Sequence, residues 1–289
     1  MNNTISTPRI IVVAGPTASG KSDFAVELAL KNKGEIISAD SRQVYRGLDI
    51  GTGKITKDEM KGVPHYMLDI VDVADIFSVA KYAELALPII EDILARGKTP
   101  IICGGTGQYI DVLIYTTETP HVEPNAILRN KLEKRPVEEL YQELVKRDPR
   151  RAHGIDKYNK VRIIRALEIV ETLGAVPEQE APSLRYDMKF YLMNPSRELV
   201  RQRIEKRLLA RLDTGMLEEC KKLLASGTTH EQLERLGLEY RYMSRYLQNI
   251  ISYDEFVTQL KNKSCQYAKR QETWNKKYLS FAELIEVKA

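Results

Sequence analysis

The chain has 289 residues, of which 43% are hydrophobic and 29% are charged, and its formal net charge is +4. This length predicts one large α/β domain, or one domain that carries an insertion. No apolar run approaches the roughly 18 residues that a membrane span needs. The first residues lack a basic region followed by an apolar stretch, so we expect no secretory signal and a cytoplasmic protein. The spacing of the three cysteines, Cys103, Cys220 and Cys265, suggests neither a disulfide framework nor a zinc site and predicts buried thiols.

The first part of the chain alternates short apolar runs with helical patterns. Apolar runs at 9–15, 35–40, 66–72 and 99–107 each end in glycine or polar residues, and residues 78–96 have helical spacing. This alternation predicts an α/β fold with a P-loop NTPase-like parallel sheet flanked by helices. Such sheets bind ligands at the carboxyl ends of their strands, so we expect Gly15, Asp40 and 104–107 to form one site.

The pattern changes after about residue 113. A turn-rich stretch at 116–126 is followed by charged amphipathic helices, and 189–194 is the one further candidate strand. We therefore expect a catalytic core formed by 1–113 and 189–289, with a mainly helical insertion domain at 114–188. From Pro195 onward the pattern is helical again, and Ser252 is a good N-cap for the last long helix.

The sequence GPTASGKS contains the strongest local signal of chemistry, because the spacing G-x-x-x-x-G-K-S occurs between a predicted strand and a predicted helix. The backbone N–H groups of 17–22 are expected to converge on phosphate oxygens at the positive end of that helix. Lys21 would supply a positive charge for the terminal phosphate, and the Ser22 hydroxyl would ligate Mg²⁺. The predicted phosphate-binding residues are Gly15, Pro16, Thr17, Ala18, Ser19, Gly20, Lys21 and Ser22.

Other polar residues at predicted strand ends offer catalytic groups. Asp40 is placed to accept a proton from a nucleophile. Asp69 is a competing carboxylate that could hold a metal, as in NTP hydrolases. Thr106 could hold a phosphate oxygen or an attacking group, or it could simply close a structural turn. The residues after Asp40 offer hydrogen bonds to a planar group, and they are Ser41, Arg42 and Gln43.

Two segments hold most of the excess basic charge. Residues 146–165 contain eight basic side chains against two acidic ones, and residues 261–278 contain six against one. Each segment could be a solvated helix face. Two such segments in a chain with a phosphate loop make a polyanion a plausible partner.

In this order along the chain, the motifs resemble those of the tRNA dimethylallyltransferases, which are P-loop enzymes. The resemblance rests on GPTASGKS, ISADSRQVYRGLDIGTGK, HYMLDI, GGTGQY, DPRRAHGIDKYNKVRIIRALEI, RQRIEKRLLARLDTGMLEE and YAKRQETW. It implies transfer of a dimethylallyl group from dimethylallyl diphosphate to the exocyclic N6 amine of the adenosine 3′-adjacent to the anticodon in tRNA. It also implies release of diphosphate and a requirement for Mg²⁺.

The resemblance assigns roles to particular residues. Asp40 would take the proton from the adenine amine, Thr106 would position that amine or the diphosphate, and Lys21 would stabilise the leaving group. Arg203 or Arg207, which share one helix face, would meet the phosphates. Residues expected to contact tRNA are Asp40, Ser41, Arg42, Gln43, Thr106, Arg162, Arg165, Arg235, Tyr240 and Arg241, and the candidate stacking platforms for the target base are Tyr240 and Tyr45.

The sequence departs from the usual family pattern in three places, and these departures bear on RNA specificity. GTGK stands where GTAK is more usual, GLEYR stands where many members have a glycine–tyrosine pair, and the stretch around 116–145 is shortened. The absence of a zinc-finger extension suggests the bacterial type. We expect a monomer that binds the tRNA anticodon stem-loop, with the insertion as an RNA-binding or lid domain, and no membrane partner.

Three other functions remain open from the sequence. A small-molecule or nucleoside kinase would use the same loop for ATP and Asp40 to activate a hydroxyl. A nucleic-acid-binding NTPase would need Asp69 as a metal-holding carboxylate. A third possibility is prenylation of free AMP, which would not need the two basic segments.

Overall fold

The computed structural model describes residues 10–116, 122–178 and 182–288. The chain divides into two compact units, Met1–Tyr115 together with Leu184–Ala289, and Thr116–Ser183. The second unit lies within the segment 114–188, where the sequence predicts the insertion. Among the described residues, no helix is long and apolar enough to cross a membrane.

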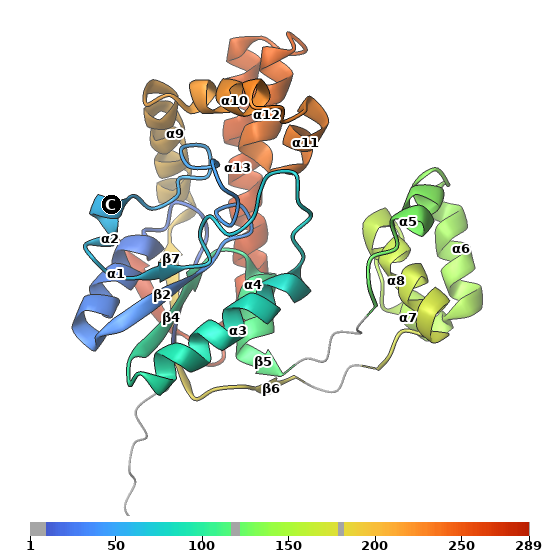
Figure 1. Ribbon diagram of the computed structural model, residues 1–289, viewed down its shortest axis with the longest axis horizontal. Coiled ribbons are helices and arrows are strands. Elements are labelled where there is room, and N and C mark those ends of the chain that lie inside the picture. The colour runs from blue at the N-terminus through green and yellow to red at the C-terminus, as the bar shows by residue number, and fades with distance from the viewer. Residues whose placement is uncertain (1–9, 117–121, 179–181, 289) are drawn as a thin grey trace, which may run out of the picture. The chain divides into compact units, whose positions relative to one another are not determined.

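The first unit is built on a six-stranded sheet in which every described pair of neighbouring strands is parallel (Figure 1). This sheet confirms the predicted α/β class. The strands, in their order across the sheet, are β3 (His65–Tyr66), β2 (Gly34–Ala39), β4 (Thr99–Gly104), β1 (Ile10–Ala14), β7 (Met188–Pro195) and β8 (Glu283–Val287).

Two features of this sheet differ from the sequence prediction. The apolar run at 66–72 is not one strand, because β3 ends at Tyr66 and the backbone of Met67 and Asp69 has positive φ angles of 63° and 54°. A continuous strand excludes such angles. The edge strand β8 was not predicted, since its sequence ELIEV is short, contains two glutamates and follows a helical pattern.

Side chains of β1 alternate between two hydrophobic cores, as the period of a strand requires. Ile10 and Val12 belong to the larger core, which includes residues of α3 (Val79–Ala95) and α4 (Gly107–Ile114). Ile11 and Val13 belong to the second core, which includes residues of α1 (Lys21–Asn32). The sheet therefore has helices on both faces, with its strand ends left for the loops that carry polar residues.

The remaining helices of the first unit come mainly from the C-terminal part of the sequence and form a group at the top of Figure 1. The last long helix begins after Ser252, which is its N-cap as the sequence predicts, and Ser252 also forms a capping box with Glu255. Phe256 and Leu260 of that helix are buried in the larger core. The bounds are α2 (Lys57–Met60), α9 (Arg197–Asp213), α10 (Met216–Ala225), α11 (His230–Arg235), α12 (Leu238–Leu247), α13 (Tyr253–Asn275) and the 3₁₀ helix η1 (Lys276–Tyr278).

The second unit is helical and has a hydrophobic core of its own, which includes Leu140, Leu144 and Leu167. Glu168 is buried in it, yet hydrogen bonds from Arg129, the backbone of Asn125 and Arg165 overcome the effect of burial and lower its pKa to about 2. The helices are α5 (Ala126–Glu133), α6 (Val137–Arg147), α7 (Pro149–His153) and α8 (Lys160–Leu173), and the paired strands β5 (Tyr115–Thr116) and β6 (Ser183–Leu184) stand where the chain passes between the two units.

Candidate active site

The carboxyl ends of three strands bring the predicted catalytic segments together. Gly104 of β4 is in register with both Ala14 of β1 and Ala39 of β2. A Cβ at Gly104 would overlap the backbone of Ala39, so glycine permits this close approach. The Thr106 N–H donates to the Ala39 carbonyl at 3.1 Å, which places the β4 turn directly beside the segment that begins with Asp40.

The phosphate loop joins β1 to α1 as its sequence predicts. Helix α1 begins at Lys21, after Gly20 in the left-handed region with φ 84°, where an L side chain would be strained. Burial lowers the pKa of Lys21, while Cys103 and Asp40 favour its charged form. The Lys21 ammonium donates to the Pro16 carbonyl at 3.3 Å, so it is held across the loop.

Asp40 is held by its own turn. Its Oδ1 accepts hydrogen bonds from the backbone N–H groups of Arg42 at 2.8 Å and Gln43 at 3.4 Å. The next backbone N–H, that of Ser41, donates to the Thr106 hydroxyl at 3.1 Å. Oδ2 of Asp40 accepts no hydrogen bond from the described residues, which leaves a carboxylate oxygen for a proton from a substrate.

These groups open into one cavity of about 410 Å³ that lies within the first unit. The proposed catalytic residues Lys21, Asp40 and Thr106 all line it, as do Arg207 and Tyr267. Burial raises the pKa of the Tyr267 phenol to about 12, so this side chain is a neutral hydroxyl near neutral pH. The cavity therefore presents a cation, a carboxylate and hydroxyls to one bound molecule.

A second cavity, of about 550 Å³, lies along the phosphate loop, where 18–22 line it together with Arg203 and Arg207. A small third cavity of about 70 Å³ is also lined by Lys21, Asp40 and Arg207. Desolvation and the like charge of Arg211 lower the pKa of Arg207. Lys21 and Arg207 line all three of these cavities, whereas Arg203 lines only the second. Of the two arginines in the predicted clamp, Arg207 is therefore the one that shares cavities with both the phosphate loop and Asp40.

Gln271, a buried residue of α13 that joins two of the site's loops, has no predicted role in the sequence motifs. Its Oε1 accepts from the Thr17 N–H at 2.8 Å, and its Nε2 donates to the Gly105 carbonyl at 2.8 Å. The Thr17 amide, which we expected to face phosphate, is thus occupied by a side chain. Gln271 is 254 and 166 residues from these partners along the chain, so no local sequence pattern predicts the contacts.

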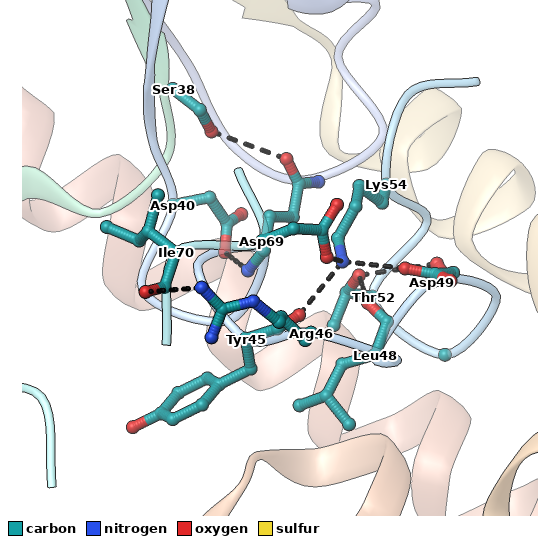
Figure 2. A network of polar contacts seen from close by, with 12 residues as sticks. Ser38, Asp40, Tyr45, Arg46, Leu48, Asp49, Thr52, Lys54, Asp69 and Ile70 are labelled. Atoms are coloured by element: carbon teal, nitrogen blue, oxygen red, sulfur yellow. Dashed lines mark hydrogen bonds and ion pairs between the residues drawn. The ribbon is translucent and has the colours of Figure 1, made fainter. Parts of the chain in front are cut away.

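Lys54 holds the segment that follows Asp40, as Figure 2 shows. Its side chain is 6% exposed, and its ammonium contacts Asp69 at 2.5 Å, Asp49 at 2.6 Å and the Tyr45 carbonyl at 2.9 Å. Asp69 is therefore the partner of a lysine, which does not support its role as a metal-holding carboxylate. Within the described ranges, no three histidine, cysteine or acidic residues form a potential metal cluster.

The expectation that Tyr240 or Tyr45 stacks on a base is wrong for this structure. Tyr240 is completely buried, and its hydroxyl donates to Glu219 at 2.6 Å. Tyr45 is only 6% exposed and packs in the larger core. A buried ring offers no free face to a base, so neither residue is retained as a stacking platform. Tyr267 is the tyrosine that lines the main cavity.

The other predicted RNA-contacting residues of the first unit lie near the same opening. Ser41, Arg42, Arg235 and Arg241 line the 410 Å³ cavity. Arg42 donates to the Arg235 carbonyl at 3.3 Å, and Arg241 donates to the Glu234 carbonyl at 2.7 Å. Gln43 instead lines the small cavity and contacts Ser38 and Gly53.

Arg162 and Arg165 belong to the second unit and differ in what surrounds them. Arg165 pairs with the buried Glu168 and donates to the Val122 carbonyl at 2.9 Å, so it helps to hold this unit together. Arg162 is exposed on α8. Several other basic residues of 146–165 pair with glutamates outside that segment, which reduces the charge available to a polyanion; they are Arg147, Arg150 and Lys160.

Similarity to known proteins covers nearly all of these elements. The chain is 42% identical, over 92% of its length and 86% of the relative's, to a tRNA dimethylallyltransferase from Exiguobacterium sp.. A tRNA dimethylallyltransferase 1 from Syntrophus aciditrophicus is 41% identical over 92% of this chain and 88% of its own.

Two solved structures share the fold. A full-length tRNA isopentenylpyrophosphate transferase from Bacillus halodurans is 35% identical with a TM-score of 0.72, over 97% of this chain and 90% of that one. A eukaryotic dimethylallyltransferase solved acting on tRNA has a TM-score of 0.84 at 29% identity, over 97% of this chain and 74% of that one. The family model for IPP transferase matches residues 43–278, and the chain therefore belongs to the IPP transferase family.

Proposed function

We propose that this protein transfers a dimethylallyl group from dimethylallyl diphosphate to the N6 amine of the adenosine 3′-adjacent to the anticodon in tRNA, and releases diphosphate. The observation that carries the proposal is that Lys21 of the phosphate loop and Asp40 of the neighbouring strand end line the same 410 Å³ cavity. One face of this cavity suits an anionic leaving group, and the other suits an acceptor that must lose a proton.

The phosphate loop supplies the leaving-group half of the reaction. When the allylic carbon–oxygen bond breaks, its electron pair stays on the departing diphosphate, where Lys21 and Arg207 stabilise the negative charge. The Ser19 hydroxyl is completely buried in this loop and has no hydrogen-bond partner in the described structure. A phosphate oxygen bound beside the loop would give that orphaned hydroxyl a partner, which fits the proposed ligand.

Mg²⁺ is part of the proposal, and Ser22 is the residue that would hold it. Ser22 lines the cavity along the phosphate loop, and a hydroxyl oxygen is a donor that Mg²⁺ accepts. When bound, the ion would neutralise part of the diphosphate charge. Because Mg²⁺ usually retains several waters and takes ligands from substrate phosphates, a site with few protein donors fits it.

Asp40 supplies the acceptor half. As the new bond forms between the amine nitrogen and the allylic carbon, the amine loses a proton, which Asp40 accepts through a carboxylate oxygen. Its other oxygen is held by the Arg42 and Gln43 amides, so the group needs no rearrangement to act. Thr106 positions the acceptor beside it, since its hydroxyl already contacts the Ser41 amide and lines the same cavity.

The tRNA is proposed to bind over the opening lined by Arg42, Arg235 and Arg241, with the exposed Arg162 of the second unit as a further contact. Phosphate contacts of this kind make RNA affinity fall with salt, by roughly 0.7 log units per contact for each log unit of salt in single strands. One chain supplies every site residue named here, so we propose a monomer. We also propose that it acts in the cytoplasm, as expected from the sequence.

The test is incubation of the protein with Mg²⁺, dimethylallyl diphosphate and an anticodon stem-loop RNA, followed by mass spectrometry of the RNA. The expected product is heavier by one dimethylallyl group, and a matched RNA with guanosine at the target position should gain nothing. Prenylation of free AMP at a comparable rate would reject tRNA as the substrate. Consumption of ATP without any mass gain in the RNA would contradict the proposal and favour a kinase.

A further inference from the structure

The guanidinium of Arg211 occupies space that is open because Gly53 has no side chain. It lies on α9, one turn after Arg207, and points to the loop that contains Gly53. A Cβ built at Gly53 would overlap Nη2 of Arg211 and lie 2.6 Å from its Cζ. Gly53 is also in the left-handed region, with φ 58°. Gly53, the second glycine of GTGK and one of this chain's departures from the usual motif, therefore leaves room for the guanidinium of Arg211.

Arg211 shares two cavities with the phosphate loop and Asp40. Arg211 lines the 410 Å³ cavity and the 70 Å³ cavity, and Lys21 and Asp40 line both as well. Its Nη1 donates to the Gly51 carbonyl at 3.3 Å, which fixes the group against the loop. A guanidinium has further N–H donors in its fork, and they remain for a ligand.

Lys21, Arg207 and Arg211 together form a cationic cluster around these connected cavities. Desolvation is the main cause of the lowered pKa of Arg207, and the like charge of Arg211 lowers it further. A bound anion removes this repulsion, so the cluster is arranged for an oxygen-rich anion. The carboxylates of Asp40 and Glu239 also line the main cavity, but neither forms an ion pair with Arg211 in the described structure.

We propose that Arg211 is a further substrate-binding residue, which holds an anionic oxygen of the diphosphate on the side that faces Asp40. The inference rests on the proposed function for the identity of the diphosphate ligand. It adds a cation that Gly53 makes possible, in the cavities that the phosphate loop and the proton-accepting carboxylate also line. Because a guanidinium binds oxyanions through parallel N–H donors, it would both attract and orient the group.

The first test measures the affinity of the full chain for inorganic pyrophosphate in the presence of Mg²⁺. R211M should weaken binding about ten- to a hundredfold, the range for loss of one charge-assisted hydrogen-bonding partner. The matched control is R201M, which removes an exposed arginine of the same helix that lines none of the three cavities and should keep wild-type affinity. Unchanged affinity in R211M would overturn the proposal.

The second test uses Gly53 in a double-mutant cycle. G53A should displace the guanidinium and weaken pyrophosphate binding by a factor close to that of R211M. In the R211M background, G53A should cause a much smaller loss, because no guanidinium remains there for the new Cβ to displace. Any cost of the strained backbone at this position is common to both backgrounds and cancels in the comparison. Equal losses in the two backgrounds would show that Gly53 does not act through Arg211, and the inference would be wrong.

RNA measurements separate this inference from the proposed function. If the wild-type protein does not prenylate the stem-loop RNA, the proposed function fails whatever R211M does. If the wild type is active, R211M should raise the KM for dimethylallyl diphosphate and leave the KM for RNA unchanged. A raised KM for RNA with unaltered pyrophosphate affinity would assign Arg211 to an RNA phosphate and overturn the inference.

Discussion

Replacement of Gln271 by methionine should loosen the active site and destabilise the first unit. Methionine has a similar volume but cannot replace either hydrogen bond of the amide, so the Thr17 N–H and the Gly105 carbonyl lose their partner. Each buried backbone group left unpaired costs about 1–3 kcal/mol. Water can enter from the adjoining cavity and recover part of this, so we expect Gln271→Met to reduce the free energy of unfolding by about 2–4 kcal/mol.

The single tryptophan of the chain provides a local assay. Trp274 lies on α13 close to Gln271 and packs against Gly107, where a Cβ would overlap its ring. Its fluorescence should therefore report unfolding of the first unit in urea. Thr273→Ala is the matched control, since it removes a hydroxyl that bonds only its own helix, at the Lys269 carbonyl, and should barely move the midpoint.

Activity should change together with stability, because Gln271 sets the distance between the phosphate loop and the turn that carries Thr106. A small misplacement of reacting groups lowers rates steeply, and we expect the rate of transfer at saturating substrates to fall roughly ten- to a hundredfold. A variant with the urea midpoint and turnover of the Thr273→Ala control would refute the assignment of Gln271 as a positioning residue.

Three further perturbations follow from the same contacts. Asp40→Asn can keep the backbone hydrogen bonds of its turn but cannot accept the proton, so transfer should slow by about 10²–10⁴ while pyrophosphate affinity is retained, and an unchanged rate in a single-turnover assay would reject the base. Lys54→Met should cost about 1–3 kcal/mol in urea unfolding, because the carbonyl of the buried Tyr45 loses its hydrogen-bond donor and the exposed Asp49 and Asp69 lose their shared cation. Arg46→Met, which breaks an exposed ion pair, should cost at most about 1 kcal/mol, and equal losses would contradict this reasoning. Hydrogen bonds from Arg96, opposed by burial and aided by Lys98 and Tyr66, lower the pKa of Glu35 from 4.5 to about 2. The ionised Glu35 therefore stabilises the fold above the unfolded-state pKa, and this stabilisation is lost as the pH falls from 4.5 to about 2. The free energy of unfolding should fall less steeply toward pH 2 in Glu35→Gln than in the wild type, and parallel curves would contradict this reasoning.

Sequence patterns were sufficient for features that depend on neighbouring residues. The phosphate loop and the polar residue after β2 are local, because each follows a buried apolar strand within a few positions. Parallel strands place their carboxyl ends along one edge, so Lys21, Asp40 and Thr106 could be assigned to one site before any contact was known. The capping box at Ser252 was predictable for the same local reason.

Patterns were less informative where burial or a partner decides the role of a residue. The family resemblance assigned Tyr240 and Arg165 to RNA contact. In the structure the Tyr240 hydroxyl donates to Glu219, and the Arg165 guanidinium pairs with the buried Glu168 of the second unit. The edge strand β8 and the break after Tyr66 likewise depend on pairing with β7 and on turn geometry, which hydrophobic spacing does not encode.

By itself, the sequence determined the α/β class with its parallel sheet, the phosphate loop and the family resemblance, because those follow from local periodicity and ordered motifs. The tertiary structure alone decided that Gln271 joins Thr17 to Gly105, and that Arg211 fits where Gly53 has no Cβ. These contacts join residues far apart in the chain, and each depends on how a helix face and a loop meet within a few ångströms. A linear pattern specifies which side chains a helix carries, but the packing of that helix against the rest of the fold determines what they reach.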